Sequence, residues 1–88
     1  MHRKKLLHRL KEFFDMDARD RAQKKDELND LLSRLKQKEF ELKAELEAEH
    51  DEKLKSEIAR KIHVVHTQRT KGVEMLMELR NEGDTKNG

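Results

Sequence analysis

Histidine and glutamate are the residues of this sequence whose spacing could hold a metal ion. His63 and His66 are three residues apart, which places them on one face of a helix. Glu47 and His50 form a Glu-x-x-His pair, a spacing that di-iron and di-manganese helical bundles use. With 5 His in the chain and more than twice as many Glu, one such spacing is expected by chance. We therefore treat these four residues as weak metal candidates, predict no cofactor, and keep a metal-binding bundle as the second alternative function.

Catalytic groups do not form a recognisable constellation. Ser33 and Ser56 fall on predicted helices among charged residues, with no base and orienting group at a useful spacing. The sequence also has no glycine-rich phosphate loop. Two paired helices enclose no pocket. We predict that the protein is not an enzyme.

The composition is typical of long helices rather than of a compact globule. Hydrophobic residues make up 33% and charged residues 45%, and Pro, Cys, Trp and Tyr are absent. Disorder also fits such a composition, but the net charge is only +2 and the apolar residues are periodic. No apolar run approaches the roughly 20 residues of a membrane span, and no secretory apolar segment follows the basic start. We expect a cytoplasmic location.

Two carboxylates mark the predicted breaks between helices. Asp17 and Asp51 can each accept a free backbone N–H at the start of a helix. The polar residues at the end of the chain, with Gly83 among them, are expected to fray. The predicted segments of this single domain (residues 1–88) are an N-terminal amphipathic helix over 2–14, a first arm over 17–49, a second arm over 51–81 and a flexible tail over 82–88.

Apolar residues of the two arms match when the chain is folded back near His50. Leu35 then lies opposite Val65, and Leu42 opposite Ile58. The sequence therefore predicts an all-α fold, an antiparallel coiled-coil hairpin with the N-terminal helix attached. Residues 12–52 hold fourteen acidic and eight basic residues, whereas 53–88 hold eight basic and five acidic, which suits side-by-side packing.

Two residues interrupt the apolar seam. Glu39 occupies a seam position, where we expect it to fix the register or to pair with Lys61 of the second arm. Gly72 lies inside the second predicted helix, where glycine costs about 1 kcal/mol relative to alanine. We therefore expect a close approach of the helices at Gly72.

Four acidic residues, Glu47, Glu49, Asp51 and Glu52, lie at the predicted turn between the two arms. This layout of helix, acidic turn and helix is similar to the coiled-coil hairpins of bacterial transcript-cleavage and secondary-channel factors. In those proteins an acidic tip enters RNA polymerase. The resemblance covers this architecture and the acidic turn only, and we assign no family from it.

Several apolar residues are not used by the predicted seam. Two helices cannot cover a second apolar stripe, so a lone hairpin would leave it exposed. We expect two copies to form a dimeric helical bundle, and we predict a protein–protein interaction or adaptor module that binds itself or a partner protein. The predicted interaction residues are Leu31, Phe40, Ala44, Val64, Met75 and Met77.

The N-terminal helix has a basic face opposite its apolar one. We favour docking of the apolar Leu6, Leu10 and Phe13 on the hairpin or on a second subunit, with the basic face in water. The alternatives are a membrane-surface helix and a nucleic-acid-binding regulator, the latter being the first alternative function. The basic face consists of Arg3, Lys4, Lys5, Arg9 and Lys11.

Overall fold

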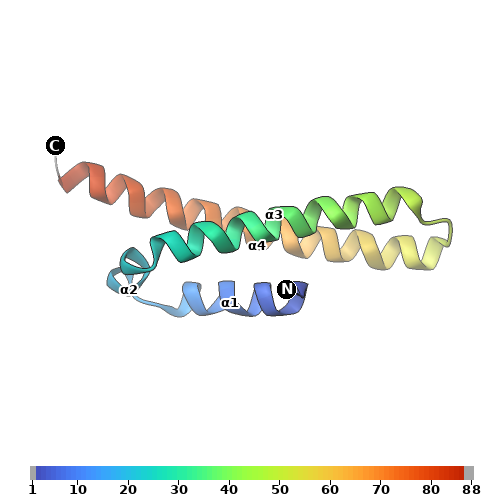
Figure 1. Cartoon of the computed structure of the whole chain (residues 1–88), viewed down its shortest axis with the longest axis horizontal. Helices are drawn as coiled ribbons and strands as arrows, with labels where there is room; N and C mark the ends of the chain where they lie inside the picture. Colours follow the sequence, from blue (N-terminus) through green and yellow to red (C-terminus); the bar gives the residue numbers. More distant parts are fainter. Residues whose placement is uncertain (1, 87–88) are drawn as a thin grey trace.

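The computed structural model describes the backbone of residues 2–86 and the side chains of residues 2–80, and this part contains helices but no strands. Its helices are α1 (Arg3–Asp15), α2 (Ala18–Gln23), α3 (Lys25–Ala48) and α4 (Glu52–Lys86). The all-α prediction is confirmed. α3 and α4 lie side by side in opposite directions, and α1 lies along the first part of α3 (Figure 1). α4 has 35 residues, which at about 1.5 Å per residue account for the 54 Å length of the molecule.

Both predicted aspartate caps are present. The Asp17 carboxylate accepts a hydrogen bond from the backbone N–H of Asp20 at 2.9 Å, at the start of α2. The Asp51 carboxylate accepts from the N–H of Lys53 at 2.8 Å and of Leu54 at 3.3 Å. Each cap satisfies backbone donors that a helix start leaves free. The helix breaks at these two places therefore follow from local sequence.

The helix boundaries differ from the predicted segments at two places. The predicted arm over 17–49 is divided at Lys24, where α2 ends and α3 begins without any side-chain cap. α4 continues through residues 82–86, which we expected to belong to a flexible tail. Gly83 costs a helix only about 1 kcal/mol relative to alanine, and no proline stops it. Residues 87–88 of the predicted tail lie outside the described residues.

The end of α1 is fixed by a side chain from α2. The Arg21 guanidinium donates to the backbone carbonyl of Phe13 at 3.0 Å and to that of Met16 at 2.7 Å. These carbonyls lie where a helix C-terminus leaves acceptors without partners. Arg21 therefore ties the end of α1 to α2 and sets the direction in which α1 leaves the junction.

The core lies where α1 packs on α3 and α4. The apolar face of α1 docks on the long helices of the same chain, as we favoured, and each fully buried side chain stabilises the fold by about 1.5–3 kcal/mol. The core residues are Leu6, Leu10 and Phe13 of α1, Leu28, Leu31, Leu32 and Leu35 of α3, and Val65, Met75, Leu76 and Leu79 of α4.

Gly72 permits the close approach expected of it. A Cβ atom on Gly72 would lie 2.5 Å from Cδ2 of Leu32 and 3.1 Å from Cδ1 of Leu10. Both leucines are buried core residues from the two neighbouring helices. The absence of a side chain on α4 at this point therefore lets α1 and α3 meet over it.

The other end of the α3–α4 pair has no such core. This outer arm, residues 40–64, extends beyond α1 toward the connection at 49–51 (Figure 1). No residue of the outer arm is buried. Its apolar Leu42, Leu46 and Ile58 are only half-buried, although they face the neighbouring helix at the spacing of a seam. Core and outer arm thus differ because the apolar face of α1 packs on the core, whereas only the N-terminal part of α1 lies beside the outer arm.

Candidate interaction surfaces

Large apolar side chains are exposed on the outer arm. Phe40 is 69% exposed and Leu54 is 43% exposed. Ala44, one helical turn beyond Phe40, is also exposed. An uncharged stripe therefore follows the side of α3 that the core does not use, at spacings of three and four residues. It consists of Ser33, Gln37, Phe40, Ala44 and Ala48.

The six predicted interaction residues divide into two groups. Phe40, Ala44, Val64 and Met77 are exposed, so they remain available for a partner. Two others are buried within the chain and so present no exposed surface. Both belong to the core that α1, α3 and α4 form together, whereas the expectation considered two helices only. These two residues are Leu31 and Met75.

Glu39 is the buried charged residue of the α3–α4 contact. Its carboxylate accepts a hydrogen bond from Arg69 Nε at 2.9 Å and lies 2.6 Å from His66 Nδ1. Lys43 lies farther away, with its Nζ at 3.8 Å. The expected pair of Glu39 with Lys61 is not formed, and Lys61 lies beside the N-terminal turn of α1. Glu39 therefore joins the two long helices through His66 and Arg69 and not through Lys61, the partner expected from the sequence.

The ionisation of Glu39 reflects two opposing effects. Burial by itself raises the pKa of this carboxyl, since it disfavours the charged form. The hydrogen bonds from His66 and Arg69 outweigh burial, so the pKa of Glu39 lies below its ordinary value. A carboxylate held in this way is costly to leave without its partners. The cluster therefore favours one register of α3 against α4.

The weak metal candidates are dispersed. Glu47 and His50 are exposed at the end of the outer arm, and His63 is exposed on α4. His66 is engaged with Glu39. In the described part of the chain, no three His, Cys, Asp or Glu side chains are grouped as metal ligands would be. His66 instead belongs to the cluster that Glu39, His66 and Arg69 form between α3 and α4.

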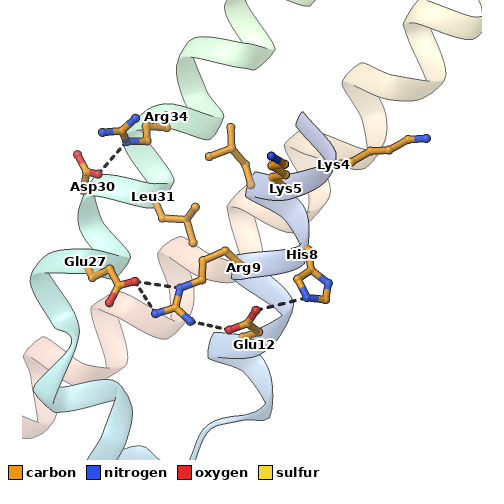
Figure 2. Close-up of a pocket in the computed structure, with 10 residues that line it drawn as sticks. Lys4, Lys5, His8, Arg9, Glu12, Glu27, Asp30, Leu31 and Arg34 are labelled. Carbon is orange, nitrogen blue, oxygen red and sulfur yellow. Dashed lines mark hydrogen bonds and ion pairs between the residues drawn. The ribbon is translucent and has the colours of Figure 1, made fainter. Parts of the chain in front are cut away.

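A groove of about 700 Å³ runs between α1 and α3 (Figure 2). Leu6 and Leu31 contribute apolar surface to it, and charged side chains stand around them. Arg9 donates to Glu12 of its own helix at 2.6 Å and to Glu27 of α3 at 2.9 Å. These hydrogen bonds raise the pKa of Arg9 above its ordinary value. The Arg9–Glu27 pair of this groove thus fastens α1 to α3.

The predicted basic face is accordingly smaller than expected. Arg9 is occupied by its two carboxylates, and its guanidinium also lies 5.0 Å from the ring centre of Phe13. Lys4, Lys5 and Lys11 are exposed. Arg3 and Lys4 lie next to Arg60 and Lys61 of α4. The sequence did not predict this proximity. A shallow hollow between these helices is lined by Arg3, Lys4, Leu7, Arg60, Lys61 and Val64.

The acidic turn has a structural use for two of its four carboxylates. The Glu49 side chain accepts from the backbone N–H groups of His50 at 3.2 Å and Asp51 at 3.1 Å. Asp51 caps α4, as described above. Glu47 and Glu52 are exposed. Glu49 and Asp51, two of the four acidic residues, therefore stabilise the backbone of the turn.

Comparisons of the chain with protein-family models, with curated proteins and with solved structures found no match. Among the residues that the structure describes, no helix combines the length and the apolar character needed to cross a membrane.

Proposed function

We propose that this protein is a non-enzymatic interaction module in which the outer arms of two copies pack together as a four-helix bundle. One observation carries the proposal. The outer arm contains Phe40, Leu42, Leu46, Leu54 and Ile58, and yet none of its residues is buried. Two helices that bury so little of their apolar surface gain little stability from each other, because helices in proteins are stabilised mainly by packing. A second pair of helices would cover them.

Charge supports a second copy as the occupant. Residues 40–52 of the arm contain six acidic residues and one basic residue, whereas residues 53–64 contain four basic residues and one acidic residue. In a two-fold dimer the same patch meets itself, so the acidic helix of one copy can lie against the basic helix of the other. Such complementarity orients the copies and disfavours other pairings. We therefore propose a homodimer with coiled-coil packing of the long helices.

Phe40 is the residue expected to anchor this interface. Exposed aromatic side chains at the centre of an interface commonly cost about 2 kcal/mol or more when truncated, which corresponds to about a 30-fold loss of affinity. Met77 provides a matched control, because it is also apolar, is 54% exposed and lies on α4 outside the outer arm.

The test is sedimentation equilibrium of three proteins: wild type, Phe40→Gln and Met77→Gln. The wild type is expected to approach twice the 10.6 kDa chain mass as its concentration rises. Phe40→Gln should weaken the dimer by about 10-fold or more, whereas Met77→Gln should leave its dissociation constant unchanged within about 3-fold. A wild type that stays at the chain mass at about 100 µM would refute the proposal. Equal weakening by both variants would place the interface elsewhere.

A further inference from the structure

The chain brings its two longest stretches without a carboxylate side chain next to each other. Residues 1–11 and residues 58–73 contain no Asp or Glu, although the chain has 19 of them. The first stretch forms most of α1 and the second forms the middle of α4. They meet at a hollow of about 190 Å³ whose lining includes no acidic residue. We name Arg3, Lys4, Arg60 and Lys61, with Leu7 and Val64 between them, the cationic strip.

The four cations of the strip differ from several other cations in forming no ion pair with a carboxylate among the described side chains. Arg9, Arg34 and Arg69 each form an ion pair. Within the described side chains, residues 2–80, no such pair within 4.0 Å involves any of the four cations of the strip. Like charges gathered from two helices repel one another, so a bound anion would stabilise this arrangement.

A second hollow next to the strip, on the side of α3, contains acidic residues and so limits the extent of the strip. Arg3, Lys4 and Lys61 also line this hollow of about 370 Å³, together with Lys38, Glu41 and Glu45 of α3. There Lys38 pairs with Glu41 at 3.2 Å. Acidic residues thus bound the strip on the α3 side, whereas the hollow on its α1–α4 side is lined only by cations and by the apolar Leu7 and Val64.

We propose that the cationic strip binds the phosphate backbone of duplex nucleic acid. A backbone presents closely and regularly spaced negative charges, which cations on two adjacent helices can contact together. The strip has no aromatic side chain on which the bases of a single strand could stack. Its lining therefore suits a duplex, whose phosphates lie outside and whose bases are stacked inside.

The other anionic partners fit the strip less well. Insertion into a membrane surface needs an exposed apolar helix face, and Leu6, Leu10 and Phe13 of α1 are buried against α3 and α4. An acidic amphipathic helix needs an apolar trough for several anchoring side chains. The strip offers only Leu7, which is half-buried, and Val64.

The test is fluorescence anisotropy with a labelled DNA duplex of about 20 base pairs, roughly two turns of the double helix, titrated at several salt concentrations. Four phosphate contacts predict a slope of log K against log salt of about −4, which is a loss of about 100-fold between 50 and 200 mM salt. The double variant Arg60→Gln, Lys61→Gln should weaken binding and reduce the slope to about −2.

The matched control is the double variant Lys36→Gln, Arg80→Gln. It removes the same charges, one Lys and one Arg, from a hollow formed by other residues of α3 and α4. It should leave the slope and the affinity nearly unchanged. Equal weakening by the control would show that net charge alone binds the duplex and would overturn the proposal. So would the absence of duplex binding at 50 mM salt, or tighter binding to phosphatidylserine vesicles or polyglutamate than to the duplex.

Arg60 and Lys61 belong both to the strip and to the basic segment 53–64 of the proposed dimer interface. The two proposals are therefore separated through a residue of the interface that the strip does not contain. Phe40 and Ala44 line neither of the two hollows beside the N-terminal turn of α1. The variant Phe40→Gln should therefore keep the salt slope per bound chain even when it no longer dimerises. Loss of duplex binding in this monomeric variant would contradict the inference that the strip of a single chain binds the duplex.

Discussion

Replacing Glu39 by Gln should destabilise the protein by about 2 kcal/mol. The carboxylate is 4% exposed and holds His66 and Arg69 at 2.6 and 2.9 Å. A hydrogen bond to a charged group contributes about 1.5–3 kcal/mol, and the His66 bond contributes less because that side chain is 55% exposed. The amide of the variant keeps one carbonyl acceptor but loses the charge. The melting temperature should fall by about 10 °C for a chain of this size.

The control for this prediction is Glu41→Gln. Glu41 also pairs with a cation, Lys38 at 3.2 Å, but its side chain is 49% exposed. The same substitution should change the free energy of unfolding by less than about 0.5 kcal/mol. Urea unfolding at one fixed protein concentration measures both variants, since dimerisation makes stability depend on concentration. A Glu39→Gln variant as stable as Glu41→Gln would refute the reasoning that the buried cluster fixes the helix register.

The pH dependence of stability gives a second readout of the same residue. Folding lowers the pKa of Glu39 from its ordinary value of 4.5, because the hydrogen bonds from His66 and Arg69 outweigh the effect of burial. Ionised Glu39 therefore stabilises the fold above about pH 4.5, and this contribution is lost as the pH falls through the folded pKa. The difference in stability between wild type and Glu39→Gln should accordingly shrink in acid.

The remaining predictions concern the close helix approach and the turn. Gly72→Ala should destabilise the protein by about 1 kcal/mol even though alanine favours helix, because its Cβ would meet the buried Leu32 and Leu10; a stabilised variant in thermal unfolding would show that the leucines yield freely. Asp51→Ala should cost about 1 kcal/mol through loss of the α4 cap, and Asp51→Asn only a few tenths. Equal stability of these two variants would show that the cap contributes nothing.

Local chemistry explains which features of the fold could be predicted from the sequence. Asp17 and Asp51 accept hydrogen bonds from backbone N–H groups no more than three residues further along the chain. The sequence around each aspartate is therefore enough to predict the helix break there. The apolar face of α1 likewise predicts docking, because its Leu and Phe residues recur at helical spacing. By contrast, Lys24 ends α2 without any capping side chain, and a lysine carries no signal for a break.

The features that the sequence did not reveal depend on where α1 lies. Leu31 and Met75 look like surplus apolar residues until a third helix covers them. The same placement brings Arg3 and Lys4 to Arg60 and Lys61, which are more than fifty positions away in the chain. The partners of Glu39, His66 and Arg69, likewise lie 27 and 30 positions away in the chain, on α4. These contacts join distant segments, and no periodicity within one segment specifies them.

Pairing of two outer arms is tested most directly by a distance between copies. The chain has no cysteine, so Glu47→Cys places one spin label on the exposed surface of the outer arm. Pulsed electron resonance should then give a distance between the two labels below about 30 Å, since packed helices lie roughly 10 Å apart and each residue adds about 1.5 Å along the helix. The distance should disappear when Phe40→Gln is added. A labelled protein with no distance between copies, or one whose distance persists in the Phe40→Gln background, would contradict the proposed interface.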